Sequence, residues 1–136
     1  MSTRANIIIT DDNGGELIFY RHCDGYPLHC GAMLEKFLGW VRGGKIRDNV
    51  GQASGWLVLL GAMEYGTLPP QSCDPEQWES VTPPDWKAGA FEPTTGIHGD
   101  IDYLYVVDLD AEALHIDGQD GYTYTGKFSA AATTPA

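Results

Sequence analysis

The fold class is indicated first by Ala5-Asn-Ile-Ile-Ile-Thr-Asp-Asp-Asn-Gly-Gly-Glu-Leu-Ile-Phe-Tyr-Arg21, close to the start of the chain. Residues 5–10 are rich in β-branched side chains, which predicts a strand near the centre of a sheet. Residues 16–21 predict a second strand, and the Asn13-Gly14 pair between the two segments is typical of a tight hairpin turn. The chain therefore begins with a predicted antiparallel β-hairpin.

Two helices are predicted to follow the hairpin. Residues 27–42 carry apolar side chains at helical spacing, Pro27 suits the first turn, and Gly43-Gly44 ends the helix. Asp48 is a good N-cap residue for the second helix. The second helix is expected to bury Val50, Ala53, Leu57 and Leu60, with Trp56 and Met63 widening that face. We interpret its glycines, at positions 51, 55 and 61, as points of close helix approach.

The second half of the chain predicts an irregular insertion followed by more strands. Residues 67–86 contain five of the eight prolines, which is typical of a surface excursion. Strands are expected at 86–91 and 102–108, with 92–100 as a loop, and shorter strands at 113–116 and 122–125. The order β-β-α-α-insertion-β-β-β predicts one α+β domain over residues 1–128, with an antiparallel or mixed sheet of about five strands and two packed helices. Residues 129–136 are expected to form a flexible tail.

Composition excludes several classes of function. The 19 acidic and 8 basic residues give a net charge of -11, which repels nucleic acid polymers and anionic membranes. No apolar run is long enough to span a bilayer, and the N-terminus lacks a signal peptide, so we expect a cytoplasmic protein. The three cysteines favour neither a disulfide scaffold nor a zinc site, and no nucleophile, phosphate-loop or dinucleotide motif is present. We predict no cofactor and no catalytic residue.

The first candidate site lies where the second strand meets the first helix, in Arg21-His-Cys-Asp-Gly-Tyr-Pro27. The fork of Arg21 suits a phosphate, the adjoining helix N-terminus favours an anion, and Tyr20 or Tyr26 offers a stacking surface. The alternative to an anion site is a turn held by hydrogen bonds, in which Asp24 bonds to the backbone and Arg21 pairs with a carboxylate.

The second candidate is Thr94-Thr-Gly-Ile-His-Gly-Asp100, together with Tyr103. Glycines and hydroxyls in a loop can form a row of amides that holds an anion. His22, Asp24, His98 and Asp100 could also form a metal centre, but this spacing is unspecific, and histidines satisfied within turns are the simpler interpretation. The one basic cluster is Arg42, Lys45 and Arg47. It either stabilises the negative C-terminal end of the first helix dipole or forms a second anion site.

Tyr20-Arg-His-Cys-Asp-Gly-Tyr-Pro27 and Gly96-Ile-His-Gly-Asp-Ile-Asp-Tyr-Leu-Tyr105 together resemble motifs of a family of small phage and prophage proteins. Its best understood members are similar to the phage Thoeris anti-defence proteins, which act as sponges for cyclic ADP-ribose signals. The resemblance covers both motifs and the order of elements between them, but neither residues 68–85 nor the tail.

The resemblance implies a viral protein of immune evasion that acts in the host cytoplasm. Such a protein binds a glycosylated cyclic ADP-ribose (gcADPR) tightly without cleaving it, so that the defence effector stays silent. It also implies dimers or larger homo-oligomers, some of which have separate sites for cyclic oligonucleotides.

Within the matching motifs the resemblance implies specific contacts. Arg21 is expected to contact the pyrophosphate with Tyr26 beside it, and Phe91 to stack on adenine just before Thr94-Thr95. His98 and Asp100 are expected to hydrogen-bond ribose hydroxyls or the glycosidic linkage. His22 and Tyr103 complete the expected site. Two rival functions remain: a metal-dependent hydrolase of the same kind of signal, and an acidic decoy that inhibits a host defence enzyme.

Overall fold

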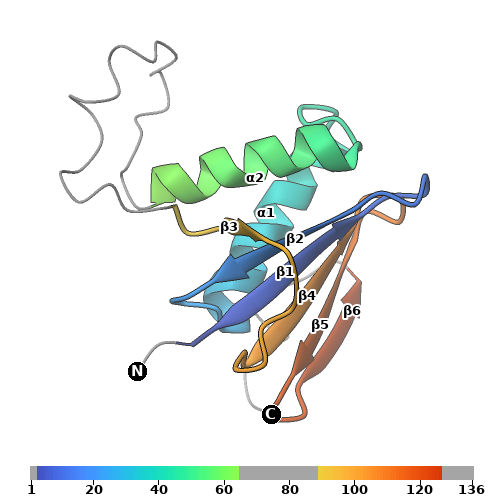
Figure 1. Cartoon of the computed structure of the whole chain (residues 1–136). Helices are drawn as coiled ribbons and strands as arrows, with labels where there is room; N and C mark the ends of the chain where they lie inside the picture. Colours follow the sequence, from blue (N-terminus) through green and yellow to red (C-terminus); the bar gives the residue numbers. More distant parts are fainter. Residues whose placement is uncertain (1–2, 65–88, 127–136) are drawn as a thin grey trace, which may run out of the picture.

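The computed structural model describes residues 3–64 and 89–126 of the chain. These residues form an α+β fold in which helices lie on one face of a six-stranded sheet (Figure 1). The strands are β1 (Ala5–Thr10), β2 (Glu16–Arg21), β3 (Glu92–Thr94), β4 (Tyr103–Asp108), β5 (Ala113–Gly118) and β6 (Thr123–Gly126). The helical elements are η1 (Pro27–Gly31), a short π-helical turn, α1 (Ala32–Arg42) and α2 (Val50–Glu64).

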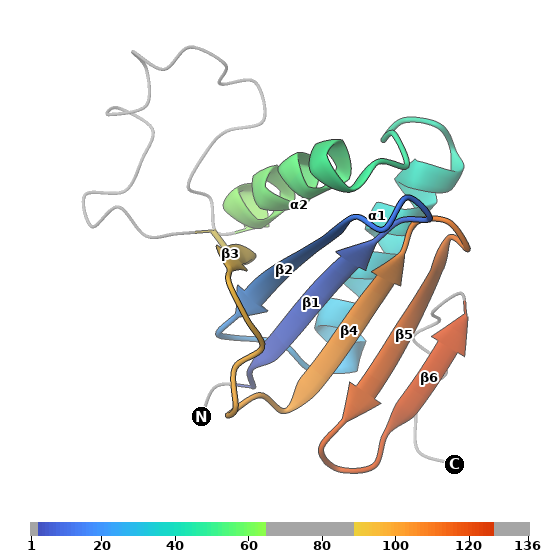
Figure 2. The ribbon, with the colours of Figure 1, turned by 45° about the vertical axis from the view of Figure 1, so that its right-hand side comes forward.

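The sheet has the strand order β3-β2-β1-β4-β5-β6 (Figure 2). The central pair, β1 and β4, runs parallel, and the other neighbouring strands run antiparallel. The predicted α+β class and mixed sheet are confirmed, with six strands in place of about five. The central position of β1 explains its composition, since Ala5, Ile7 and Ile9 are fully buried against the helical layer.

The hairpin between β1 and β2 forms as its sequence predicts. Gly14 adopts a φ of 79°, a value that favours glycine. The Asp11 carboxylate accepts hydrogen bonds from the N–H groups of Asn13 and Gly15 in the turn, and from that of Val50 at the start of α2, at 2.9–3.2 Å. The bond from Gly15, followed by that from Val50, lowers the pKa of Asp11. Asp11 therefore fastens the tip of the hairpin to the helical layer.

The helices agree with the predicted ranges apart from their first turns. The predicted helix 27–42 is present as η1 followed directly by α1. The second helix begins at Val50, because Asn49 caps it in place of Asp48: the Asn49 side chain accepts the Gln52 N–H at 3.2 Å. The core is built from residues of both layers, among them Phe19, Leu34, Phe37, Leu38, Leu57, Tyr105, Val107 and Leu114.

The prediction around β3 was wrong. A strand was expected at 86–91 and a loop at 92–100, whereas β3 is Glu92–Thr94 and residues 89–91 belong to no strand. Ala90 and Phe91 are buried because they pack against α2, with the Ala90 N–H bonded to the Gly61 carbonyl at 3.1 Å. The predicted insertion at 67–86, residues 86–88 of the expected strand and the tail at 129–136 lie outside the described residues. Within the described part, no helix has the length and apolar composition for a bilayer crossing.

Candidate functional site

Arg21 lies in a buried polar cluster beneath the end of α2, and its side chain is 0% exposed. Its guanidinium donates hydrogen bonds to both carboxylate oxygens of Glu64, and its Nε donates to the Cys23 carbonyl at 2.7 Å. The guanidinium carbon also lies 4.9 Å from the centre of the Phe91 ring. Arg21 therefore joins β2 to α2 and to the segment before β3. It pairs with a carboxylate, which was the predicted alternative to phosphate binding.

Glu64 is held ionised by its neighbours. Burial alone would raise the pKa of the Glu64 carboxyl, but the hydrogen bonds and charge of Arg21, helped by His29, bring it below its ordinary value. Nε2 of His29 lies 3.1 Å from Oε2 of Glu64. Cys30 is fully buried beside this cluster, and burial raises the pKa of its thiol to about 12. Cys30 is therefore protonated at neutral pH, which excludes it as a nucleophile.

Another group of predicted residues gathers around Tyr20, which points away from Arg21 on the opposite face of β2. The Tyr20 hydroxyl lies 3.0 Å from Nδ1 of His22, and the His98 ring stacks on the Tyr20 ring with centroids 4.1 Å apart. Oγ1 of Thr94 lies 3.4 Å from Nε2 of His98. The structure thus brings His22, Thr94 and His98 together, but separates them from Arg21 and Phe91 by the thickness of the sheet.

The remaining members of the predicted site lie at the same end of the sheet. Tyr26 is 39% exposed, with its ring centroid 6.0 Å from that of His29, and Thr95 is exposed directly after β3. Asp100 forms an ion pair with Arg4 at 3.2 Å. The predicted residues therefore surround this end of the sheet instead of converging on one cavity.

His98 and Tyr103 line an open pocket of about 450 Å³ between the start of β4 and the end of β5. Asp102 and Asp117 line the same pocket, and the Tyr103 hydroxyl donates to Asp120 at 3.1 Å. Carboxylates so close together repel a phosphate group. This acidic pocket is therefore better suited to hydroxyl or amino groups than to a pyrophosphate.

The predicted basic cluster lies at the opposite end of the sheet, in the loop between α1 and α2. The loop is fixed by Ile46, which is 5% exposed and whose N–H donates to the Trp40 carbonyl at 3.2 Å. Gly44 turns the chain with a φ of 76°. With Ile46 buried, Lys45 and Arg47 on either side of it are exposed to solvent.

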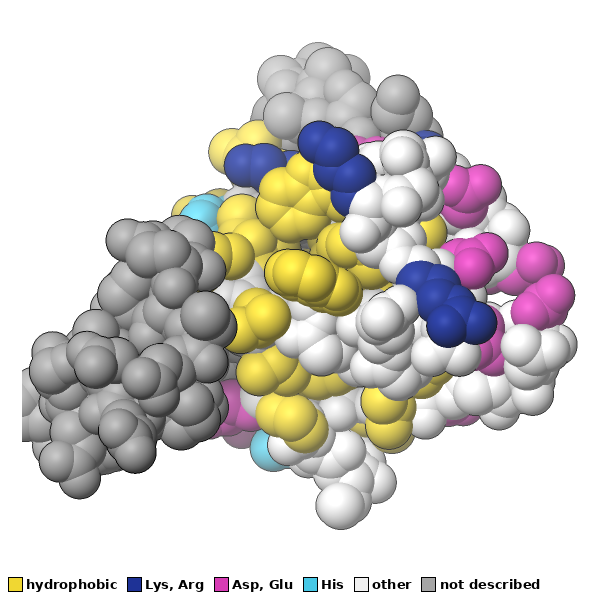
Figure 3. Space-filling view, turned by 90° about the horizontal axis from the view of Figure 1, so that it is seen from above, with side chains coloured by type: hydrophobic (Ala, Val, Ile, Leu, Met, Phe, Trp, Pro, Cys, Tyr) yellow, Lys and Arg dark blue, Asp and Glu magenta, His cyan; other side chains and the backbone are white. Residues whose placement is uncertain are grey.

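Lys45 and Arg47 line an open pocket of about 520 Å³, which we call the basic pocket. Asp48 and Gln52 contribute hydrogen-bonding groups to it, and Trp56 contributes an indole that is 47% exposed. Gln52 and Trp56 are one helical turn apart, so they lie on the same face of α2. Seen from above, Lys and Arg side chains border an apolar area on the face that carries α2 (Figure 3).

Lys45 and Arg47 have no carboxylate partner among the described residues, unlike the remaining described arginines. Within the part of the chain that the structure describes, no ion pair involves either residue. The arginine ion pairs are Arg4–Asp100, Arg21–Glu64 and Arg42–Glu35. Arg42, the third member of the predicted cluster, also donates to the Glu112 carbonyl at 2.7 Å, and its hydrogen bond to Glu35 raises its pKa. Arg42 therefore holds α1 in place and does not line the basic pocket.

The metal centre considered for His22, Asp24, His98 and Asp100 does not form. Among the described residues, the one group of potential ligands close enough to share an ion is Asp24, His29 and Glu64. His22 and His98 instead flank Tyr20.

Sequence reasoning missed two residues of the basic pocket, Gln52 and Trp56. Trp56 was expected on the buried face of α2, but it lies on the exposed side. The spacing of four residues between Gln52 and Trp56 was the available signal, because it places the indole beside a polar residue and next to the basic loop.

Comparison with family models, with curated proteins and with solved structures finds no match for this chain.

Proposed function

We propose that this chain binds a small nucleotide signal of the cyclic ADP-ribose type and sequesters it without cleaving it. The observation that carries the proposal is the basic pocket, where Lys45 and Arg47 have no carboxylate partner in the described part of the chain and lie beside an exposed Trp56. The ligand class comes from the two motifs that resemble the anti-defence family, and the position of the site comes from the pocket.

The chemistry of the basic pocket suits a phosphate-bearing ring system. Two cations can share the charge of a pyrophosphate, and arginine can do so with two parallel hydrogen bonds. The indole of Trp56 offers a flat surface on which an adenine can stack. Gln52 and Asp48 can hydrogen-bond the base edge or sugar hydroxyls. At about 520 Å³ the pocket falls within the usual range for small-molecule sites.

The charge of the whole protein restricts what can enter this pocket. A chain with a net charge of -11 repels extended polyanions, so DNA, RNA and anionic membranes are poor partners. A small ligand experiences mainly the local field of the pocket, where Lys45 and Arg47 outnumber the carboxylate of Asp48, because more distant charges are screened by salt. The expected contacts of Arg21 and Phe91 are not part of this proposal, since both side chains are buried in the core.

Self-association through α2 would strengthen such a site. Val58 and Leu59 are exposed at 37% and 42%, and Glu64 is the one ionisable residue of the helix. Two copies of so acidic a protein meet most easily where each presents an uncharged apolar surface. We therefore include a homodimer in the proposal, in which pairing through α2 adds the cations of a second copy. Sedimentation should detect a dimer in the wild-type chain and a monomer in Leu59→Glu.

Titration calorimetry tests the proposal directly. The purified chain is titrated with gcADPR isomers, with ordinary cyclic ADP-ribose and NAD as comparisons. We expect tight binding of one cyclic isomer and recovery of the intact ligand after heat denaturation, which separates a sponge from a hydrolase. In the host cytoplasm such binding would silence the effector.

Matched variants locate the binding site. Lys45→Ala and Arg47→Ala should each weaken binding by at least about tenfold, the loss of roughly one charge-assisted hydrogen bond. Lys36→Ala is the control, because it removes the same charge from an exposed lysine on α1 outside the basic pocket. Equal binding by wild type, Lys45→Ala and Arg47→Ala would refute this site. If no nucleotide produced heat, an inhibitory protein partner would become the leading candidate.

A further inference from the structure

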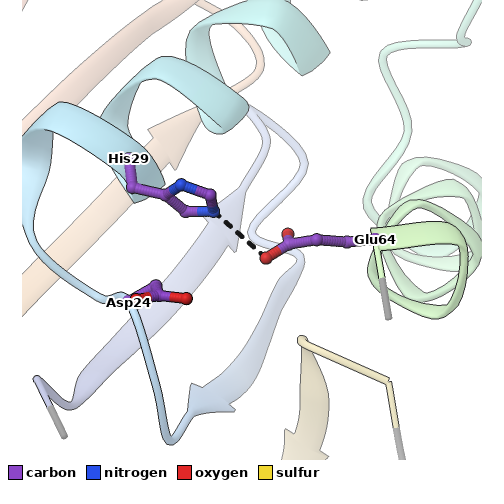
Figure 4. Close-up of side chains that lie close together, drawn as sticks. All are labelled: Asp24, His29 and Glu64. Carbon is purple, nitrogen blue, oxygen red and sulfur yellow. Dashed lines mark hydrogen bonds and ion pairs between the residues drawn. The ribbon is translucent and has the colours of Figure 1, made fainter. Parts of the chain in front are cut away.

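Three side chains from separate elements meet beneath the end of α2 (Figure 4). Asp24 comes from the loop after β2, His29 from η1, and Glu64 is the last residue of α2. One potential ligand atom of each lies within 4.8 Å of the others. From this geometry we infer a binding site for one divalent transition-metal ion, with Zn²⁺ as the ion that fits best.

The loop that carries Asp24 is fixed on both sides. Arg21 donates to the Cys23 carbonyl before it, and the Gly25 N–H after it donates to the Thr3 carbonyl at 2.9 Å. The buried hydroxyl of Tyr105 donates to the Gly25 carbonyl at 2.6 Å. Asp24 is held at a φ of 58°, an uncommon value for a residue other than glycine. The backbone that presents this ligand is therefore preorganised, which lowers the ordering cost of binding an ion.

The charges of the group favour a cation. Asp24 and Glu64 carry two negative charges, and Arg21 balances one of them through Glu64. Asp24 forms no ion pair with any described residue. One negative charge is thus left over beside the imidazole of His29, and a divalent ion would be attracted to it.

Arg21 does not exclude an ion from Glu64. Each carboxylate oxygen has two lone pairs, and the guanidinium uses one on each oxygen. Oε2 of Glu64 also faces Nε2 of His29 at 3.1 Å, so one ion beside this pair could be ligated by both atoms. Arg21 then acts as the outer partner that orients a ligating carboxylate, an arrangement common around metal sites.

The donor set indicates which ion is preferred. Zn²⁺ binds histidine nitrogen and carboxylate oxygen at about 2.0–2.2 Å, so two of its ligands are at most about 4.4 Å apart. Asp24 is exposed, and a small rotation of its side chain closes the remaining gap. One imidazole with two carboxylates favours a first-row transition metal over Mg²⁺ or Ca²⁺, which prefer oxygen ligands alone. Three protein ligands leave the fourth tetrahedral position open to solvent.

Competition for Zn²⁺ between the untagged full-length chain and a chromophoric chelator tests the inference. We expect one ion per chain, and affinity reduced by more than about tenfold in His29→Ala and in Asp24→Asn. Both substitutions are at exposed or half-exposed positions, and near-UV circular dichroism checks that the fold is retained. Zn²⁺ should also raise the melting temperature of the wild type but not of His29→Ala, because the ion joins η1 to the end of α2.

Two controls make the outcome decisive. His22→Ala removes an exposed histidine outside the group and should bind Zn²⁺ as the wild type does. Cys23→Ser should also bind normally, because no cysteine belongs to the group. The inference is overturned if the wild type binds no stoichiometric Zn²⁺, or if His29→Ala binds it with unchanged affinity. The basic pocket lies at the opposite end of the sheet, so this result is independent of nucleotide binding.

Discussion

At the scale of single residues, the fold depends most on the buried ion pair between Arg21 and Glu64. Arg21 is 0% exposed and Glu64 is 14% exposed, so removal of either partner leaves a charge in a poorly hydrated place. Arg21→Met keeps the apolar stem of the side chain and deletes its charge. We expect it to lower the free energy of unfolding by about 3 kcal/mol, at the lower end for a broken buried pair because Glu64 retains His29 and some solvent. Urea denaturation followed by near-UV circular dichroism measures this loss.

A surface ion pair serves as the control for that prediction. The side chains of Arg4 and Asp100 are 37% and 60% exposed, so Asp100→Asn should cost less than about 1 kcal/mol. If Arg21→Met and Asp100→Asn cost the same, the buried cluster would not have the structural importance that we assign to it.

The same cluster predicts a pH dependence. The pKa of Glu64 is lower in the folded chain than its ordinary value of 4.5, so the unfolded chain takes up a proton at Glu64 more readily. The stabilisation from Glu64 is therefore complete above pH 4.5 and is lost as the pH falls through the lower folded value. The difference in unfolding free energy between wild type and Glu64→Gln should stay constant from pH 7 down to pH 4.5 and shrink as the pH falls further. A difference that stays constant below pH 4.5 as well would show that Glu64 does not titrate with folding.

The sequence could not choose between the roles of Arg21. The local sequence around a buried arginine does not differ from that around an arginine that binds a phosphate. The partner of Arg21, Glu64, is 43 positions away in the chain. Lys45 and Arg47 were identifiable because their cluster is local in sequence. Their lack of carboxylate partners among the described residues is a property of the folded arrangement, which local sequence does not reveal.

At the scale of elements, local patterns predicted β1, β2, α1 and β4 well, because each has a clear periodicity or a turn signal of its own. β3 was missed for the opposite reason. It has three residues, includes Pro93, and owes its place to pairing with β2 across a long sequence separation. Ala90 and Phe91 fell within the predicted strand, but they are buried because they pack against α2.

Two glycines of α2, Gly55 and Gly61, differ in the space around them. A Cβ on Gly61 would lie 2.7 Å from the Phe91 nitrogen, whereas a Cβ on Gly55 meets no described atom within 4 Å. Gly55→Ala should therefore stabilise the chain by about 0.5–1 kcal/mol through helix propensity alone. Gly61→Ala should destabilise it, because the backbone of residues 90 and 91 would have to move. Thermal or urea unfolding of the two variants tests this, and a stabilising Gly61→Ala would contradict the close packing.

At the scale of the whole molecule, the order of the strands places the candidate sites. Ala5 pairs with both Arg21 and Tyr103, so the motifs that contain these residues meet at one end of the sheet. Asp11, which follows β1, bonds the start of α2 and brings the basic loop to the other end. The parallel pairing of β1 with β4 joins segments about a hundred residues apart. Periodicity carries no information on such pairing, which is why the sequence supplied the elements but not the arrangement of the sites.

The net charge of -11 predicts that salt stabilises the folded chain at neutral pH. At pH 7 the compact chain concentrates 19 carboxylates against 8 basic side chains, and unfolding relieves this repulsion. Salt screens exposed charges over a distance that falls from about 30 Å at 0.01 M to about 3 Å at 1 M, and it affects the buried Arg21–Glu64 pair much less. Raising NaCl over this range should therefore shift the urea midpoint upward at pH 7, but have little effect near the isoelectric point of about 4.4. Urea is required because guanidinium is itself a salt. A midpoint that falls with NaCl at pH 7 would mean that surface ion pairs outweigh the repulsion, and that the acidic excess is not what limits the stability of this fold.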